Sequence, residues 1–281
     1  MNIAHSVEVE RGDRFRFGAN WQRFLSAVND QRIAQAEESL RLMLEIADLT
    51  GKRFLDMGCG SGLFSLAARR LGAEVRSFDY DPQSVACTAT LKNRYFPGDS
   101  SWTVEEGSAL DERYIRELGD FDYVYSWGVL HHTGAMQAAL GNAQIPVKEG
   151  GYLYIAIYND QGSKSKFWAA IKRTYCRGPL GKFIITAIFV PFFTLQSVAL
   201  SMLKYKNPWA YFTEYRSRRG MSIYHDWIDW LGGYPFEVAK PEQILRFYRR
   251  AGFALIGLIT TNRMGCNEFL FQKNQNALPN A

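Results

Sequence analysis

Short apolar runs alternate with segments of helical apolar spacing through the middle of this chain. Buried strands are predicted at 53–56, 74–79, 102–106, 121–126 and 152–158. Helices are predicted between those strands, near 62–71, 82–93, 110–118 and 134–145. Strands that alternate with helices are typical of a parallel sheet with helices on both faces, so the pattern predicts an α/β fold.

The segments on either side extend this pattern. A helix with apolar residues at three-and-four spacing, from Ile33 to Ala47, precedes the first strand. Residues 159–239 interrupt the alternation, and a helix at 240–250 with strands at 253–261 and 267–272 resumes it. We therefore expect an N-terminal arm at 1–30 that covers the site, a core at 31–158 and 240–273, a helical cap at 159–239 that is inserted for the substrate, and a frayed tail at 274–281.

One stretch of the expected cap, 183–203, has no charged side chain and lies between Lys182 and Lys204. Its length would allow it to cross a membrane. However, strands before and after it must join one sheet, which argues against a crossing, and Pro191 predicts a break into two short helices. Three roles stay open: a buried lid over the active site, an apolar face dipping into a membrane surface, and a homodimer interface.

Composition is that of an ordinary globular protein, but charge is unevenly distributed. The chain has 281 residues, of which 47% are hydrophobic and 22% charged, and a formal net charge of +5. Up to residue 157 it is acidic, and beyond that it is basic. The basic part favours an anionic partner, such as a phosphorylated or carboxylated substrate, a lipid headgroup or nucleic acid, although a solvated lysine-rich surface would explain it equally well.

The cysteines and the N-terminal residues indicate the cellular compartment in which the protein is expected. The four cysteines show neither metal-ligand spacing nor a pairing pattern, so we expect a reduced cytoplasmic protein with no metal. Residues 1–24 are polar and charged, unlike a signal peptide.

The first strand ends in a carboxylate and leads into a glycine-rich turn, LDMGCGSG at 55–62. Alternating glycines give a bare backbone shelf on which a nucleoside-bearing cofactor can lie. A carboxylate directly before them would repel a pyrophosphate but attract an ammonium group, which favours S-adenosylmethionine. The predicted binding residues here are Asp56, Gly58, Cys59, Gly60 and Gly62, with Cys59 as a small filler.

Later strand ends supply the remaining cofactor candidates. Asp79 ends the second strand and is placed to accept the two ribose hydroxyls, whereas Asp81 before Pro82 suits a helix N-cap. The turn at 107–111 lies where an adenine edge would be held. Besides Asp79, the predicted contacts are Tyr80, Ser108, Ala109, Trp127 and Gly128.

Five ordered motifs carry a family resemblance: LDMGCGSG at 55–62, FDYDP at 78–82, EGSALD at 106–111, FDYVYSWGVLHH at 121–132 and EGGYLYIAIY at 149–158. Together they resemble class I S-adenosylmethionine-dependent methyltransferases, in the branch of the ubiquinone-pathway small-molecule enzymes. The resemblance implies a Rossmann-like, doubly wound seven-stranded sheet with its last strand antiparallel. The cap would then be inserted between strands five and six.

Methyl transfer needs a positioned acceptor and often a base for its proton. His131 and His132 follow strand four, where the acceptor should lie, and a neutral imidazole suits that role at neutral pH. We favour His132 as the base over His131, since adjacent side chains point in different directions and one of the pair would pack or cap a helix. Tyr158 and Asn159 end strand five at the same edge, where they could orient the acceptor or begin the cap.

Substrate recognition is expected from the cap and the arm. The run RRGMSIYHDWIDWLGGYPFE at 218–237 combines aromatic, acidic and basic side chains, which suits a sugar or another polyhydroxylated ring. A helix with exposed acids and buried tryptophans is the alternative. The predicted contacts are Arg219, Trp227, Trp230 and Tyr234 from the cap, Asn159, and Trp21 from the arm.

We therefore expect an S-adenosylmethionine-dependent methyltransferase acting on a small-molecule or glycan-type acceptor at oxygen, with an anionic or lipid-linked acceptor making use of the basic cap and apolar segment. The alternatives are an RNA or protein methyltransferase and a non-catalytic cofactor-binding protein. Strand four is followed by Ser126-Trp127-Gly128, not by the Asn/Asp-Pro-Pro-aromatic run that holds a base amine, which disfavours nucleic acid. The expected location is cytoplasmic, with peripheral membrane contact through 183–203.

Overall fold

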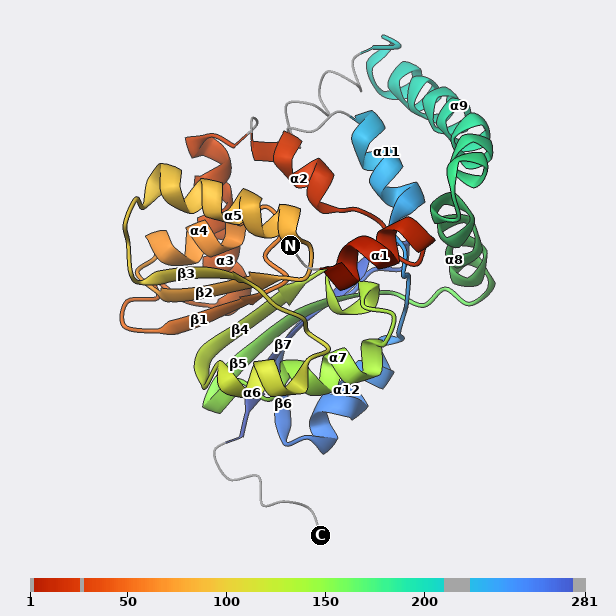
Figure 1. Cartoon of the computed structure of the whole chain (residues 1–281). Coiled ribbons are helices and arrows are strands. Elements are labelled where there is room, and N and C mark those ends of the chain that lie inside the picture. The colour runs from red at the N-terminus through yellow and green to blue at the C-terminus, as the bar shows by residue number, and fades with distance from the viewer. Residues whose placement is uncertain (1–2, 26–27, 210–222, 275–281) are drawn as a thin grey trace.

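A computed structural model describes residues 3–25, 28–209 and 223–274 of the chain. Its centre is a seven-stranded sheet in the order β3-β2-β1-β4-β5-β7-β6 (Figure 1). β7 is antiparallel to both of its neighbours, while β1 to β5 pair in parallel. The expected doubly wound sheet with an antiparallel last strand is thus confirmed. The strands are β1 (Arg53–Met57), β2 (Glu74–Asp79), β3 (Trp102–Glu106), β4 (Phe121–Trp127), β5 (Val147–Tyr158), β6 (Phe253–Ile259) and β7 (Cys266–Lys273).

The sheet grows in opposite directions from β1, which has β2 on one side and β4 on the other. In register, Asp56 of β1 lies between Ser77 of β2 and Tyr125 of β4. Parallel strands present their carboxyl ends at one edge, and a crevice forms there where the strand order reverses. The ends of β1, β2 and β4 are therefore brought together, although they are far apart in the sequence.

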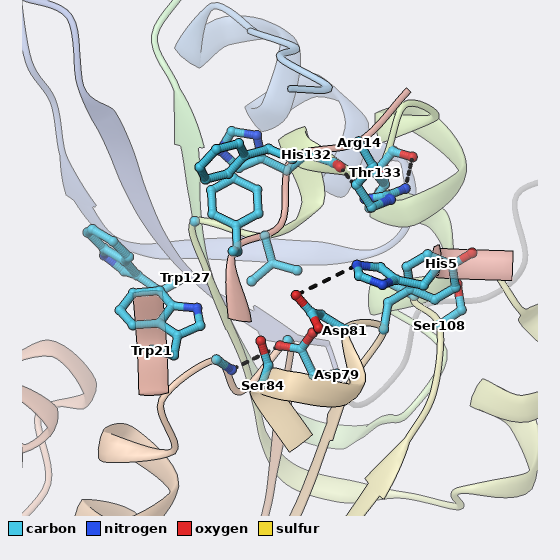
Figure 2. A pocket seen from close by; sticks show the side chains of 18 of the residues that line it. His5, Arg14, Trp21, Asp79, Asp81, Ser84, Ser108, Trp127, His132 and Thr133 are labelled. Atoms are coloured by element: carbon cyan, nitrogen blue, oxygen red, sulfur yellow. Dashed lines mark hydrogen bonds and ion pairs between the residues drawn. The ribbon is translucent and has the colours of Figure 1, made fainter. Parts of the chain in front are cut away.

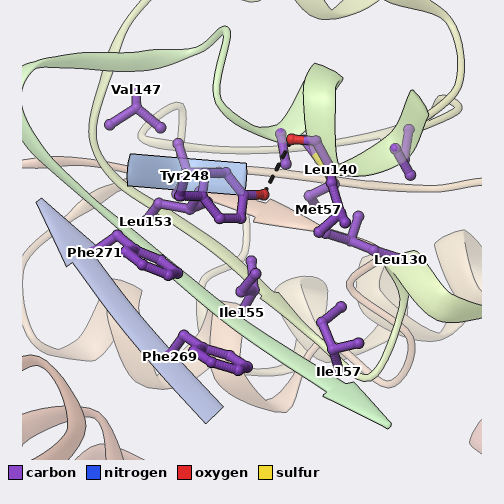
Figure 3. Packing of buried hydrophobic residues seen from close by; sticks show 14 of the residues in the cluster. Met57, Leu130, Leu140, Val147, Leu153, Ile155, Ile157, Tyr248, Phe269 and Phe271 are labelled. Carbon is purple, nitrogen blue, oxygen red and sulfur yellow. Dashed lines mark hydrogen bonds between the residues drawn. The ribbon is translucent and has the colours of Figure 1, made fainter. Parts of the chain in front are cut away.

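Helices cover both faces of the sheet, as its apolar strands require. On one face, Leu140 and Tyr248 pack on strand residues such as Phe271, and the Tyr248 hydroxyl donates a 3.0 Å hydrogen bond to the Leu140 carbonyl (Figure 3). This face carries α6 (Glu112–Glu117), α7 (Met136–Ala143) and α12 (Pro241–Arg250). The opposite face carries α3 (Asp30–Leu44), α4 (Leu63–Arg70) and α5 (Pro82–Tyr95).

The N-terminal segment is helical and lies over the carboxyl edge of the sheet. It forms α1 (Ile3–Arg11) and α2 (Gly18–Leu25), and α2 packs beside α5 (Figure 1). The described part of the segment 159–239 also consists mainly of helices: α8 (Ser163–Cys176), α9 (Pro179–Tyr205) and α11 (Ile223–Gly232). These three helices share a small apolar cluster of their own, formed around Ile171, Ile185 and Leu231.

Helix α9 corrects two expectations. It is one continuous helix with Pro191 inside it, and Trp168 of α8 packs on Phe189 and Phe193, which lie on either side of the proline. It is not a buried lid. Only 11% of its most apolar 18-residue stretch is buried, and none of its residues lines the cavity described below. Within the described part of the chain, α9 alone has the length and apolar composition to cross a membrane.

Candidate active site

A cavity of about 850 Å³ lies at the carboxyl edge of the sheet. Its walls come from the strand ends, from the N-terminal segment and from α11. Figure 2 shows Trp21 and Trp127 at one side of this pocket, and His132 well away from Asp79. The volume lies in the range of sites for small molecules and cofactors.

The loop after β1 and the end of β2 form one end of the cavity. Asp79 accepts two backbone hydrogen bonds, from Gly60 N to Oδ2 and from Asp81 N to Oδ1, both of 2.9 Å. Burial raises the pKa of Asp79 to about 6, although the two hydrogen bonds oppose this shift. The carboxylate is held in a fixed orientation inside a cavity, where it can accept further hydrogen bonds from hydroxyl groups.

Most of the predicted cofactor residues line this end of the cavity. Besides Asp79 they are Gly58, Gly60, Tyr80, Ser108, Ala109, Trp127 and Gly128. Three others do not line it. Gly62 directly precedes α4, and Cys59 accepts a 3.2 Å hydrogen bond from the Thr88 hydroxyl, so it packs against α5 as the filler expected.

Asp56 also does not line the cavity, and this changes its expected role. Its side chain is buried and accepts a hydrogen bond from the Ser65 hydroxyl of α4. Ser77 Oγ donates to Ser65 Oγ at 2.7 Å, and Trp102 Nε1 donates to Ser77 Oγ at 2.9 Å. Burial raises the pKa of Asp56 to about 7. Asp56 therefore anchors the glycine loop to α4 and the neighbouring strands. The expectation that its carboxylate attracts the cofactor directly is not met.

His132 lines the other end of the cavity. It follows β4 in a short 3-10 helix, η1 (Leu130–His132). Its Nδ1 lies 2.5 Å from the Pro235 carbonyl, and because a carbonyl only accepts, Nδ1 carries the proton and Nε2 keeps a lone pair. Burial lowers the pKa of His132 to about 3, so the ring is neutral at physiological pH. The geometry is that of a proton acceptor.

His131 lies beside His132 but does not face the cavity. It is fully buried, with its ring 4.1 Å from that of Tyr158 and 4.5 Å from that of His132 between centroids. Burial holds its pKa well below the usual value. Of the two histidines, the structure thus places only His132 at the cavity, and His131 packs beneath it.

Aromatic side chains surround His132. The rings of Phe17 and Tyr158 lie 5.0 and 5.4 Å from it, and Trp230 lies 6.0 Å from Tyr158. Tyr158 and Trp230, together with Trp21, are the predicted catalytic or substrate residues that line the cavity besides His132. Asp229, next to Trp230, accepts a hydrogen bond from Asn20 Nδ2.

Four predicted substrate residues are not in the described lining. Asn159 donates a 2.8 Å hydrogen bond to the Thr261 carbonyl and so joins the end of β5 to the loop after β6. Trp227 packs on Phe193 of α9 at 5.7 Å between ring centroids. The Tyr234 carbonyl accepts a 2.8 Å hydrogen bond from Phe15 N. Arg219 lies outside the described residues.

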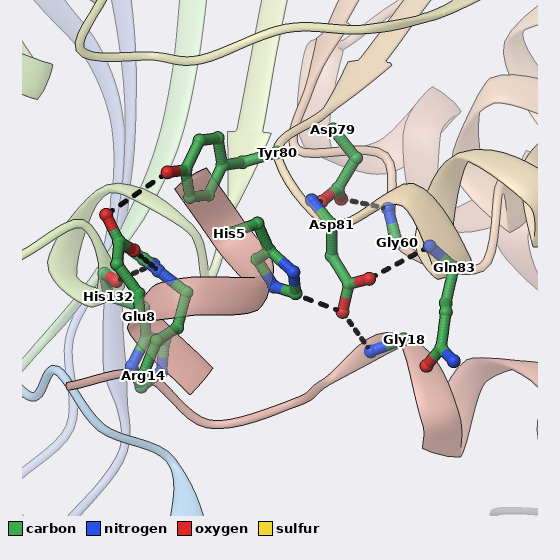
Figure 4. Close-up of polar contacts among 10 residues, drawn as sticks. All are labelled: His5, Glu8, Arg14, Gly18, Gly60, Asp79, Tyr80, Asp81, Gln83 and His132. Atoms are coloured by element: carbon green, nitrogen blue, oxygen red, sulfur yellow. Dashed lines mark hydrogen bonds and ion pairs between the residues drawn. The ribbon is translucent and has the colours of Figure 1, made fainter. Parts of the chain in front are cut away.

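The sequence predicted an arm over the site at 1–30 but not the particular contacts that α1 and the segment after it make there. Arg14 donates to the carbonyls of His132, at 2.9 Å, and Thr133, at 3.2 Å, and pairs with Glu8 at 2.6 Å (Figure 4). Glu8 also accepts a 3.1 Å hydrogen bond from the Tyr80 hydroxyl, and His5 lies 3.6 Å from the Asp81 carboxylate. The aromatic content around Phe17 was the only sequence signal that this segment approaches the site.

Sequence comparisons relate the chain to methyltransferases. The model of a family described as "Methyltransferase domain" matches residues 28–225. The ubiquinone biosynthesis O-methyltransferase of Paraburkholderia xenovorans is 33% identical over 137 residues, 48% of this chain and 56% of that protein. The enzyme of the same name from Xanthomonas oryzae pv. oryzae is 31% identical over 158 residues, 55% of this chain and 62% of that protein. The matches therefore span less than two thirds of these relatives.

Structural comparisons agree on the fold. An O-methyltransferase family protein from Burkholderia thailandensis superposes with a TM-score of 0.55 and 16% identity, over 97% of this chain and 68% of that one. Magnesium protoporphyrin IX methyltransferase from Synechocystis PCC 6803, with bound S-adenosylhomocysteine, gives 0.53 and 14%, over 92% and 94% of the two chains. At such identities the likeness shows the architecture alone.

Proposed function

Because this chain belongs to the methyltransferase domain family, we propose that it transfers a methyl group from S-adenosylmethionine to a hydroxyl oxygen of a small-molecule acceptor. The observation that carries this proposal is the neutral His132, whose Nδ1 is held by the Pro235 carbonyl at the end of the cavity away from Asp79. A fixed group that can take up a proton at that end favours a hydroxyl of the substrate as the group that is methylated.

S-adenosylmethionine, the cofactor of this family, fits the residues at the Asp79 end. The Asp79 carboxylate has acceptor capacity left for the ribose hydroxyls, beyond its bonds to Gly60 N and Asp81 N. Gly58 and Gly60 offer bare backbone, and Ser108 and Ala109 line the place expected for adenine. When bound, the cofactor supplies an electrophilic methyl group on a positively charged sulfur.

The residues of the chain would then position the acceptor and remove its proton. Phe17, Tyr158 and Trp230 offer aromatic faces beside His132 on which a ring can pack. The hydroxyl proton would pass to His132 Nε2 as the oxygen takes up the methyl carbon and the carbon–sulfur bond breaks, because at that point the hydroxyl is acidic enough for a weakly basic imidazole. Most of the rate enhancement is expected from positioning and exclusion of water.

The charge of the described lining favours a neutral hydroxylated acceptor. The lining contains one guanidinium group, that of Arg14, among its described residues, and Arg14 is already engaged with Glu8 and two carbonyls. Carboxylates are far more numerous there: Glu8, Asp79, Asp81, Asp111, Asp226 and Asp229. We therefore propose a phenolic or sugar-like acceptor and set aside the expectation that the acceptor itself is anionic.

The test is a transfer assay with S-adenosylmethionine labelled on its methyl group. The full chain is incubated with a panel of phenols and glycosides, with total RNA, and with a protein extract. We expect label in small molecules that carry a free hydroxyl and none in their methoxy analogues. Label in RNA or protein, or transfer to the methoxy analogues at the same rate, would overturn the proposal.

A further inference from the structure

The outward face of α9 is apolar, like its inward face, whereas the outer face of an ordinary surface helix is polar. Its buried side contains Ser197 and Ser201 together with Ile185. On the outward side, Phe183, Leu195 and Leu203 are 71%, 70% and 83% exposed. Further exposed residues along the helix are Leu180, Ile184, Ile188, Phe192, Leu200 and Met202. So large an exposed apolar surface marks a site of interaction.

Basic side chains, and no acidic ones, occur in the stretch 161–209 that contains α8 and α9. Between residues 161 and 209 the chain contains no Asp or Glu. Exposed cations occur at both ends of α9 and along α8: Lys164, Lys166, Arg173, Arg177, Lys182, Lys204 and Lys206. Helices that lie in a lipid interface combine an apolar face with lysine and arginine in this way.

We propose that α9, with the exposed cations at its ends and along α8, binds the surface of an anionic phospholipid bilayer. The helix would lie in the plane of the interface. It would not cross the bilayer, because β5 before it and β7 after it are hydrogen-bonded neighbours in one sheet.

Charge favours a bilayer over a second copy of the chain as the occupant of this face. Two copies packed through α9 would bring cations such as Lys182 and Lys204 toward cations, with no acid between 161 and 209 to offset them. Anionic headgroups would neutralise the same side chains while the acyl region receives Phe183, Ile188 and Phe192.

Helix α9 is connected to the acceptor end of the cavity through aromatic side chains of α8 and α11. Trp230, which lines the cavity, packs at 5.4 Å on Trp168 of α8, and Trp168 packs at 5.5 Å on Phe189 of α9. Binding to a bilayer would therefore bring that end of the cavity close to the membrane surface.

Vesicle co-sedimentation tests the proposal. The full chain is mixed with vesicles of phosphatidylcholine and phosphatidylglycerol, or of phosphatidylcholine alone. We expect the protein to pellet with the anionic vesicles, and less so as salt is raised. The double substitution Ile188→Glu and Phe192→Glu should lower the bound fraction about tenfold or more. Leu42→Glu is the matched control, because Leu42 is 70% exposed on α3, away from α9 (Figure 1).

Two results would overturn this proposal. One is vesicle binding that the double substitution leaves unchanged. The other is absence of binding to the anionic vesicles. A concentration-dependent dimer, measured by sedimentation velocity and abolished by the double substitution, would then assign this face to a second copy of the chain. Calorimetric titration with S-adenosylmethionine shows that each variant is folded, and it separates failure at this surface from failure of the proposed catalytic function.

Discussion

Gly60 and Asp79 are joined by a 2.9 Å hydrogen bond from the glycine N–H to the carboxylate, which ties the loop after β1 to the end of β2. The same carboxylate accepts from Asp81 N and lines the cavity. One residue thus orders the glycine loop and presents a hydrogen-bond acceptor to the cavity.

Replacing Asp79 by Ala should weaken binding of S-adenosylmethionine by about 10- to 100-fold. Hydrogen bonds to a charged group contribute about 1.5–3 kcal/mol each, and the ribose hydroxyls would lose their acceptor. Isothermal titration calorimetry measures the change. Asp120→Asn, at an exposed carboxylate outside the cavity, is the control. Unchanged affinity in the Asp79 variant would remove its ribose role.

Cofactor affinity should rise with pH through the titration of Asp79. Burial raises the pKa of Asp79 to about 6, so the carboxyl group is largely protonated at about pH 5 and ionised at about pH 8. The ionised form accepts hydrogen bonds more strongly and attracts a cationic cofactor. Calorimetry across this range should show tighter binding at higher pH in the wild-type chain and a flatter profile in Asp79→Asn. A flat wild-type profile would contradict the assignment.

The raised pKa of Asp79 has the opposite effect on the stability of the folded protein without cofactor, which should fall as pH rises. The folded-state pKa lies above the unfolded value of about 4, so Asp79 favours the folded state below about pH 4. This contribution is lost as pH rises through about 6. Thermal unfolding should therefore show a smaller decline in Tm over that range in Asp79→Asn than in the wild-type chain.

Replacing His132 by Ala should lower turnover by about 10²- to 10⁴-fold and leave the cofactor Kd unchanged, because the imidazole acts on the acceptor. The pKa of about 3 keeps His132 neutral, so activity should not fall with the titration of an ordinary histidine near pH 6.5. Single-turnover kinetics measures the chemical step. Turnover like that of the wild type would show that His132 is not the base.

Replacing Arg14 by Ala should loosen α1 over the cavity. The guanidinium donates to the carbonyls of His132 and Thr133 and pairs with Glu8, and all three contacts would be lost. Hydrogen exchange in residues 3–17 should become faster, with a weaker cofactor affinity. Arg16→Ala, at an exposed position, is the control. Equal exchange in both variants would mean that Arg14 does not hold the segment in place.

Replacing Gly58 by Ala should destabilise the chain for two separable reasons. Gly58 has φ +86°, and a Cβ there would lie 2.4–2.9 Å from side-chain atoms of Val129. The backbone strain costs about 1–3 kcal/mol, and the overlap adds to it. Val129→Ala removes the two Cγ atoms, at 2.4 and 2.5 Å, but keeps Cβ at 2.9 Å, so combining it with Gly58→Ala should restore most of the part due to overlap and none of the part due to backbone strain. Chemical denaturation of the single and double variants measures both parts, and no restoration would place the clash elsewhere.

The sequence predicted residues of the cavity lining where the local pattern of strands and turns and the chemistry of the side chain indicate the same position. The glycine loop, Asp79 and the turn at Ser108 could be identified because strand ends, turns and N-caps depend on neighbouring residues. Other predicted positions, Tyr234 among them, have their side chains outside the described lining. Asp56 turns to Ser65, and His131, Asn159 and Trp227 pack among or bind other parts of the fold.

The sequence by itself determined the order of strands and helices, the family and the donor end of the site, because apolar periodicity and the glycine loop are local properties of the chain. Only the tertiary structure decided which histidine faces the cavity, that Arg14 and Glu8 close over it, and that α9 turns its apolar side outward. Each of these depends on contacts between segments distant along the chain. The absence of charged residues from 183–203 shows that α9 is apolar, whereas packing against α8 and α11 decides which of its residues stay exposed.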